Sequence, residues 1–496
     1  MDKAENDLFG SLFPMRMTSI ERFHCLDEDT KFPNLIFFRF RIDGKINSDL
    51  AKQAWQAALE RQPFGDVVPE RINGQWFWVS GPRAKGNRSV DAWNGARFEY
   101  QELDTPPDWN YDQHRTRSKT GSYLGISVWR THSPRPTAAD KQSQNARSRQ
   151  TETDTIGFTT EVMFYVHHAI ADGAAAVSVV NDWMLIYANL RSGRSVHNGI
   201  HRLDCDLFQK RNCLGLLEWR YLRHLPKQPV ALYGAIKFSF RKTAELIPAV
   251  VRQQTEDPVD TSHERFPQIV GRWIDESKVK KLVEQSEIHG VMLNSVLLGQ
   301  FYLALIHWRQ LQGFHSDQDW IRVILPMSIR NVSDRRLPSA NRATIVQIDR
   351  RKKDMADVGK LYQNLDHEIR VIRGWQLDKM FLLAIRGLAI FDTLLTRSVG
   401  NKKSRGMAVF TNLGDPLRKS VRASMREPDS TAYIRPMEID PVGPIRKGTP
   451  VNVSISRFES RIRISMHYDA SELSRDQALS LFGTYYHQLA NVGESN

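Results

Sequence analysis

The sequence predicts a mixed α/β protein made of two similar layered halves. In the first half, an aromatic and β-branched strand pattern over 34–43 leads into 48–62, which has helical periodicity behind a Ser cap. From about Glu264 the alternation returns, with predicted helices over 275–288 and 293–308 and a predicted strand over 320–329. A 496-residue chain would normally divide its core between two domains, so we expect two α/β layers.

The other elements follow from the same two periodicities. In the first half, aromatic and β-branched runs predict strands over 75–80, 123–130 and 157–166, and an apolar helical pattern covers 174–190 and ends near Gly193. In the second half we expect strands over 342–349, 408–413, 451–458 and 461–469, and helices over 353–373, 376–397 and 476–490. No short-period repeat of the solenoid kind is present.

Two segments do not fit this alternation. Residues 131–154 are polar and interrupted by Pro, which predicts a mobile surface insert. Between the halves, a basic and aromatic region predicts either helices with solvated basic residues or an amphipathic surface that touches lipid. Its marked residues are Trp219, Arg220, Tyr221, Arg223, Lys237, Phe238, Phe240, Arg241 and Lys242. We therefore expect an N-terminal subdomain over 1–205, a basic bridging region over 206–263 and a C-terminal subdomain over 264–496.

Composition and charge narrow the class of protein. Lys and Arg exceed Asp and Glu by 69 − 56 = 13, a bias that could attract phosphates, acidic carrier proteins, anionic lipid or nucleic acid. Because no zinc-finger spacing, aromatic RNP pattern or basic heptad accompanies the excess, nucleic-acid binding is unsupported.

The cysteines and the apolar segments bear on location. Cys25, Cys205 and Cys213 form no CxxC pair, which fits a reducing compartment and predicts no metal site. The acidic and polar start is unlike a signal peptide, and no run reaches the roughly 20 apolar residues of a spanning helix. We expect a soluble cytoplasmic protein, with peripheral membrane contact as an open alternative.

The segment HHAIADG, residues 167–173, contains the candidate catalytic residues. It follows a predicted buried strand and opens a predicted helix. His168 could act as a general base because imidazole titrates near physiological pH. Backbone N–H groups around Gly173 and Ala174 could stabilise an oxyanion, and Asp172 could cap the helix or pair with an Arg. His167 is expected to support its neighbour.

These residues resemble a known superfamily. HHAIADG matches the HHxxxDG signature of condensation domains and the HxxxD signature shared with alcohol acyltransferases, wax-ester synthases and chloramphenicol acetyltransferase. Later segments are similar in the same order: the helix MLNSVLLGQFYLAL, the strand end LPMSIR, the Thr-Asn-x-Gly segment FTNLGD and the hairpin SISRFESRIRISMHYD. The plant-type DFGWG motif, a carrier-protein serine motif and adenylation motifs are missing from the sequence.

The resemblance implies a fold and an activity. It implies two chloramphenicol acetyltransferase-like subdomains that form a V around a central tunnel. It also implies an acyltransferase that moves an acyl group from acyl-CoA or an acyl carrier protein, as co-substrate, to the hydroxyl or amine of a small-molecule acceptor, without a metal or other cofactor. The alternative is a non-catalytic binding or scaffold protein of the same fold.

The resemblance also assigns roles to residues outside HHAIADG. Arg330, at the end of LPMSIR, is the expected partner of Asp172. Thr411, Asn412 and Gly414 are expected to line the substrate channel, although Asn412 beside Gly414 is as consistent with a simple turn.

Overall fold

The computed structural model describes most of both halves of the chain. The described residues are 12–28, 32–43, 46–65, 67–80, 97–103, 123–132, 158–214, 241, 243–247, 268–314, 319–400, 406–418 and 436–493. Beyond His132, the predicted insert over 131–154 lies outside them, as do all the marked residues of the bridging region except Arg241. The predictions made for those segments therefore stay predictions.

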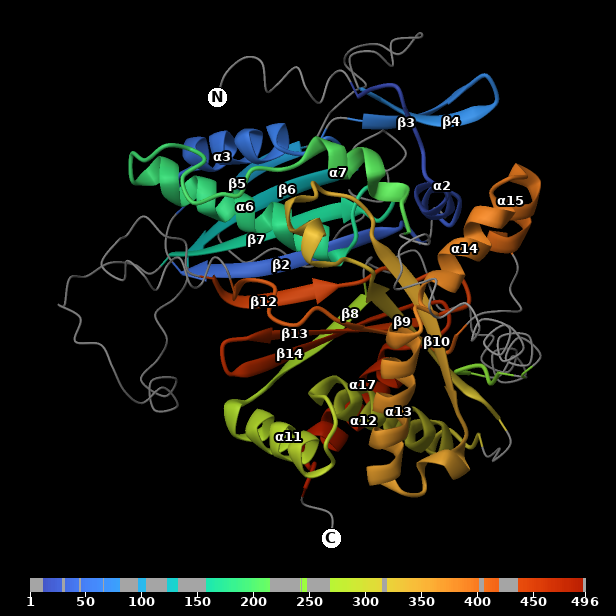
Figure 1. Ribbon diagram of the computed structural model, residues 1–496. Helices are drawn as coiled ribbons and strands as arrows, with labels where there is room; N and C mark the ends of the chain where they lie inside the picture. Colours follow the sequence, from blue (N-terminus) through green and yellow to red (C-terminus); the bar gives the residue numbers. More distant parts are fainter. Residues whose placement is uncertain are drawn as a thin grey trace, which may run out of the picture.

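The first half is built on a five-stranded sheet with strand order β12-β2-β7-β6-β5. Its own strands are β2 (Leu35–Asp43), β5 (Arg97–Leu103), β6 (Leu124–His132) and β7 (Phe158–His167). The helices α3 (Ser48–Glu60) and α6 (Gly173–Arg191) cover one face of this sheet (Figure 1). Phe38 of β2 lies opposite Phe164 of β7, and Trp55 and Trp183 of the helices are buried in the same core.

Shorter elements complete this half. The strands β1 (Met15–Arg16), β3 (Val67–Ile72) and β4 (Gln75–Ser80) form a small sheet in the order β1-β4-β3. The helix α2 (Ser19–Leu26) begins with a capping box in which Thr18 and Glu21 satisfy each other's backbone N–H groups. The short helix α7 spans Cys205–Gln209.

A six-stranded sheet with strand order β10-β9-β11-β13-β14-β8 forms the second half. Its strands are β8 (Gln268–Ile274), β9 (Ile321–Ser328), β10 (Ala343–Arg350), β11 (Ala408–Asn412), β13 (Val451–Phe458) and β14 (Arg461–Tyr468). Its main helices are α11 (Glu276–Ile288), α12 (Leu293–Leu311), α13 (Val358–Gly374) and α17 (Arg475–Ala490). Phe301 of α12 packs on Phe410 of β11 and Tyr485 of α17, so helices and sheet share one core.

One strand crosses from the second half into the first sheet. β12 (Pro436–Val442) pairs antiparallel with β2, and it contacts β13 and β14 of the other sheet (Figure 1). Arg463 of β14 forms an ion pair with Asp440 of β12. The first sheet therefore contains a strand that lies within the predicted C-terminal subdomain, an exchange that the predicted boundaries do not include.

The architecture confirms the predicted α/β fold, and its differences from the prediction are local. The helical stretch predicted over 376–397 divides into α14 (Lys379–Leu388) and α15 (Asp392–Gly400). The sequence patterns also missed β1, α2, β3, β5, α7, β8 and β12. Several of these are short, and VVPERI of β3 and PMEIDPV of β12 contain Pro and charged residues, which weaken a strand pattern.

Among the described residues, no single helix is long and apolar enough to cross a membrane. The helices α11 and α12 meet that criterion only as a pair, and they are bent by 103°.

Candidate active site

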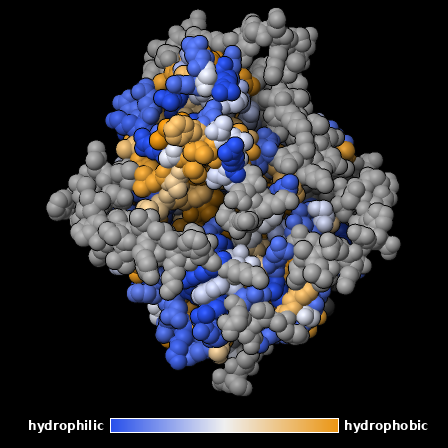
Figure 2. All heavy atoms as spheres, turned by 90° about the vertical axis from the view of Figure 1, so that its right-hand side faces the viewer, coloured by the Kyte–Doolittle hydropathy of each residue, from blue (hydrophilic) through white to orange (hydrophobic). Residues whose placement is uncertain are grey.

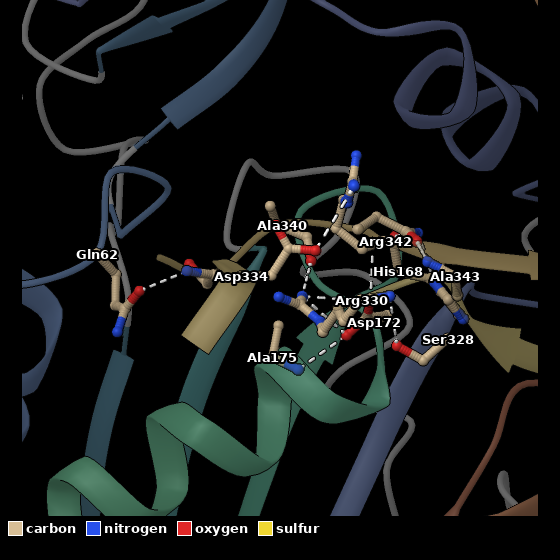
Figure 3. Close-up of polar contacts among 12 residues, drawn as sticks. Gln62, His168, Asp172, Ala175, Ser328, Arg330, Asp334, Ala340, Arg342 and Ala343 are labelled. Carbon is tan, nitrogen blue, oxygen red and sulfur yellow. Dashed lines mark hydrogen bonds and ion pairs between the residues drawn. The ribbon is translucent and has the colours of Figure 1, made fainter. Parts of the chain in front are cut away.

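His168 lies in the loop that joins the end of β7 to the start of α6. The apolar strand FTTEVMFYVH ends at His167, and α6 begins at Gly173 with Asp172 as its N-cap. The backbone N–H of His168 donates to the carbonyl of Asn34 at 2.8 Å, which anchors the loop to the chain that leads into β2. The motif thus places the imidazole at the edge of the first half that faces the second (Figure 3).

The second half holds the imidazole from the other side. Nδ2 of Asn341, in the loop between β9 and β10, lies 3.0 Å from Nδ1 of His168 and donates to the His168 carbonyl at 2.7 Å. Oδ1 of Asn341 accepts the N–H of Ala343 at 3.0 Å, which fixes the orientation of the amide. Within the described chain, no protein group hydrogen-bonds to the other ring nitrogen, Nε2.

A second histidine stacks on the first. The ring of His24, on α2, lies parallel to that of His168, with centroids 4.2 Å apart and an interplanar angle of 5°. Nδ2 of Asn34 lies 3.0 Å from Nδ1 of His24 and donates to the His24 carbonyl at 3.2 Å. The sequence analysis missed both α2 and His24; the Thr-x-x-Glu capping box could have indicated the helix, but nothing in SIERFHCL indicates where that helix packs.

The surroundings favour neutral imidazoles. Burial lowers the pKa of His168 to about 4, although the hydrogen bond to its own backbone carbonyl and the charge of Asp172 act in the opposite direction and His167 lowers it further. Burial, with His168, His167 and Arg446, also holds the pKa of His24 well below its usual value. Both rings are therefore uncharged at neutral pH, which lets them stack without repulsion.

Asp172 joins the two halves below the imidazole. Its Oδ1 accepts the N–H of Ala175 at 2.8 Å, as an N-cap does, and its Oδ2 accepts the N–H of Arg342 at 2.8 Å. Nη2 of Arg330 lies 3.2 and 3.3 Å from the two carboxylate oxygens, the pairing that the sequence predicts, and donates to the carbonyl of Ala340 at 2.6 Å. Figure 3 shows these contacts converging beside His168. Asp172 is 2% exposed, so its carboxylate is screened from water, whereas the Arg330 side chain is 17% exposed.

The start of α6 lines the site with backbone. Gly173 and Ala174 both line the cavity described below, and no acceptor in the described residues takes their first-turn N–H groups. A Cβ on Gly173 would lie 2.9 Å from Cδ2 of Leu413, because the segment after β11 approaches the helix closely here. Glycine at 173 thus allows the two halves to meet.

The three channel residues predicted in the second half have different positions. Thr411 and Asn412 line the cavity, whereas Gly414 lies in a turn at φ 64°, between the lining residues Leu413 and Asp415. Oδ1 of Asn412 accepts the N–H of Gly414 at 2.9 Å, and its Nδ2 donates to Oδ1 of Asn294 at 2.9 Å. Asn412 therefore forms the simple turn and also lines the cavity.

His167 is fully buried and does not line the cavity described below. Its Nδ1 accepts the N–H of Ala169 at 3.1 Å, which places the ring proton on Nε2, 3.4 Å from a carboxylate oxygen of Glu28. The ring also packs edge-on against Tyr123, with centroids 4.9 Å apart. The supporting role expected for His167 stays a prediction.

A cavity of about 650 Å³ lies at the junction of the two halves. His24, His168 and Asp172 line it from the first half, and β9, β10 and β11 line it from the second. Apart from alanine, proline and glycine, its apolar lining residues are Ile20, Phe23, Phe32, Ile36, Val177, Ile324, Met327, Leu337, Ile345, Val409, Leu413, Val442 and Ile445. Among the described residues, no group of three or more His, Cys, Asp or Glu side chains could hold a metal ion.

The comparison with solved structures covers almost the whole chain. The first condensation domain of the calcium-dependent antibiotic synthetase, in complex with a substrate analogue, matches with a TM-score of 0.63 at 13% identity, over 97% of this chain and 96% of that one. This chain has the condensation-domain fold. A trichothecene 15-O-acetyltransferase from Fusarium sporotrichioides matches with a TM-score of 0.62 at 10% identity, over 96% and 94% of the two chains.

Other solved structures with this fold differ in activity. The starter condensation domain of rhizomide synthetase, in complex with C8-CoA, matches with a TM-score of 0.60 at 9% identity, over 99% and 97% of the chains. The epimerization domain of tyrocidine synthetase B matches with a TM-score of 0.59 at 12% identity, over 97% of each chain. Neither a scan against protein-family models nor a search of curated proteins finds a match. The fold therefore does not determine the reaction, and the argument for function depends on the site.

Proposed function

We propose that this protein is an acyltransferase that moves an acyl group from a thioester donor to a hydroxyl or amine acceptor, with His168 as general base. The observation that carries the proposal is the position of His168, which lines the cavity between the halves and whose Nε2 has no hydrogen bond to any described residue. In the chemical step, Nε2 takes the proton of the acceptor as its oxygen or nitrogen attacks the thioester carbonyl. The carbon–sulfur bond then breaks, and the thiol leaves with a proton.

The ring is arranged for this step. A base that acts through Nε2 carries its remaining proton on Nδ1, and Asn341 holds the loop by donating to the carbonyl of His168. The lowered pKa makes the imidazole a weaker base but keeps it unprotonated throughout the physiological range. His24 acts as a positioning residue, because its parallel ring fixes the plane of the base.

The negative charge of the tetrahedral intermediate would be stabilised at the start of α6. The first-turn N–H groups of Gly173 and Ala174 line the cavity and add the positive end of the helix dipole. The carboxylate of Asp172 accepts the N–H of Ala175, the next donor of the same turn, and it also holds the loop through Arg330. Its role is therefore to position the base. The apolar cavity suits an acyl chain.

The donor would be recognised by charge. Arg335 and Arg418 line the cavity, are exposed, and form no ion pair within the described residues. Both coenzyme A, through its phosphates, and an acidic carrier protein would be attracted to these guanidinium groups. The donor is therefore an acyl-CoA or an acyl carrier protein, and Thr411 and Asn412 line the same cavity.

Release of free thiol from a panel of acyl-thioesters, with and without hydroxyl and amine acceptors, tests the proposal. His168→Ala should lower the rate by about 10²–10⁴-fold, the range for a general base. The matched control is His24→Phe, which keeps a stacked ring beside His168 and should retain most of the rate. Equal rates for His168→Ala and wild type would contradict the proposal. If no thioester reacts although the chain is folded, the non-catalytic alternative replaces it.

A further inference from the structure

The turn between α14 and α15 exposes large apolar side chains. Ile390 is 74% exposed, Phe391 61% and Leu394 43%, whereas Ile385 and Leu395 of the same helices are buried with Phe23 of α2. Figure 2 views the side of the molecule on which α14 and α15 lie in Figure 1, and hydrophobic side chains gather on this face. Neighbouring exposed apolar residues of this size indicate an interaction surface. We call Ile390, Phe391 and Leu394 the apolar tip.

Arginines surround the base of the apolar tip. A cavity of about 660 Å³ is lined by Arg16, Arg22 and Arg386 together with Ile390, and one of about 360 Å³ by Arg16, Arg22 and Phe391. The acidic residue in these linings, Asp392, is already paired with Arg22 and with Arg71. Arg16 and Arg386 are exposed and have no carboxylate partner among the described residues. The surface therefore carries a net positive charge beside its apolar residues.

We infer that the apolar tip and these arginines bind the surface of a bilayer that contains anionic phospholipid. Projecting apolar side chains can enter the boundary between headgroups and acyl chains, and guanidinium groups just behind them can bind lipid phosphates. A second copy of the chain fits less well, because a symmetric contact would bring the arginines of the two copies together. The first residues of the predicted bridging region, Gln209, Arg211 and Asn212, line the larger of these two cavities, but the marked residues where the sequence suggested lipid contact form no part of the proposed surface.

The surface lies one helix away from the cavity that contains His168. Arg22 of α2 faces the basic cavities, while Ile20 and Phe23 of the same helix line the candidate active site. Phe23 also packs edge-on against Phe381 of α14, with ring centroids 5.6 Å apart. Lipid bound at the apolar tip would therefore place bilayer-borne acyl substrates close to the cavity. The binding itself does not depend on the proposed function.

Vesicle flotation of the full chain tests the inference. The wild-type protein should float at low salt with phosphatidylcholine vesicles that contain phosphatidylserine, and much less with phosphatidylcholine alone. Binding should weaken as salt rises. The double variant Ile390→Ser, Phe391→Ser should bind about tenfold or more weakly, because it removes the apolar contact. The control Ile288→Ser, at a residue that is 70% exposed at the end of α11, should bind as the wild type does.

Two double variants, each of which removes two positive charges, measure the electrostatic contribution to vesicle binding. Arg16→Gln with Arg386→Gln should weaken binding roughly fivefold for each arginine, whereas Arg475→Gln with Lys353→Gln, at exposed positions elsewhere, should have a smaller effect. Wild-type protein that stays unbound at low salt, or apolar-tip variants that float like Ile288→Ser, would overturn the inference. A wild-type protein that is a dimer in solution, and whose apolar-tip variants are monomers, would also overturn the inference. Circular dichroism shows whether each variant is folded, so this test stands even if no thioester is turned over.

Discussion

His24 and His168 have the same local environment but depend on different parts of the molecule. In each case the side-chain amide of an asparagine lies 3.0 Å from Nδ1 and donates to the backbone carbonyl of the same histidine. For His24 that asparagine is Asn34, ten residues away in the first half. For His168 it is Asn341, in the second half and 173 residues away.

This difference shows which contacts make the site depend on assembly of the two halves. The asparagine that holds His24 lies in the first half, so this hydrogen-bonded pair can form without the second half and offer a surface on which His168 stacks. His168 acquires its environment only when the loop of residues 329–342 contacts the first half, where Asn341, Arg330 and Arg342 all reach it or Asp172. We therefore expect changes on the His168 side to affect both stability and rate.

The largest effect is expected at Asp172. Asp172→Ala leaves Arg330 without its carboxylate and removes an N-cap, and breaking a buried pair costs about 3–5 kcal/mol. The matched control is Asp204→Ala, because Asp204 also caps a helix and also pairs across the halves, with Arg336, whose side chain is 60% exposed. That change should cost only about 1–2 kcal/mol. Urea unfolding of both variants measures the difference, and equal losses would show that burial of the pair does not matter.

The second prediction concerns the stability of the folded protein at acidic pH. The folded protein holds the pKa of His168 at about 4 against an ordinary value of 6.5, so the unfolded chain binds more protons between these values. Stability should therefore fall as pH is lowered from 6.5 to 4, and His168 should account for about 3 kcal/mol of that fall. His24 should contribute in the same direction.

Denaturant unfolding at the two ends of this pH range measures the effect. His168→Gln should lose less stability on acidification than the wild type, by roughly 3 kcal/mol, and His24→Phe should also lose less. The same loss in all three proteins would mean that carboxylates alone cause the acid sensitivity.

Replacement of each asparagine by alanine directly tests the comparison of His24 with His168. Asn341→Ala and Asn34→Ala each remove one donor to a buried carbonyl, and each should cost about 1–3 kcal/mol. Only Asn341→Ala frees the ring of the proposed base, so kcat should fall about tenfold or more in that variant and by less than about threefold in Asn34→Ala. Parallel measurements of kcat and KM decide the matter, and equal losses of kcat would mean that His24 and His168 are equally close to the chemistry.

The sequence predicted the parts of the site that a local pattern contains. HHAIADG placed His168, Asp172 and Gly173 at a strand-to-helix junction, and its resemblance to a superfamily indicated Arg330, which does lie against Asp172. The two-layer fold also followed from alternating periodicities, because the long apolar elements such as β7 and α12 have strong patterns.

What the sequence could not predict depends on contacts between distant segments. Neither His24 nor Asn341 belongs to a motif, and their positions follow from how α2 and the loop after β9 pack against His168. The transfer of β12 to the first sheet depends on pairing with β2, which is about 400 residues earlier in the chain. Such pairings are set by tertiary packing, which a single sequence does not reveal.

The smallest effect is expected at Gly173, where the two halves approach closely near His168. Gly173→Ala would place a Cβ 2.9 Å from Cδ2 of Leu413. Because that atom is the end of a flexible side chain, a small rotation can relieve the contact, and the expected cost is about 1 kcal/mol.

A double-mutant cycle measures this contact. The double variant Gly173→Ala, Leu413→Ala should recover most of the loss relative to Leu413→Ala alone. Gly483→Ala, where nothing lies within 4 Å of the added Cβ, is the control within α17 and should not destabilise the protein. If Gly173→Ala costs nothing and Leu413→Ala does not interact with it, the close approach of the two halves at the start of α6 is not required for the fold.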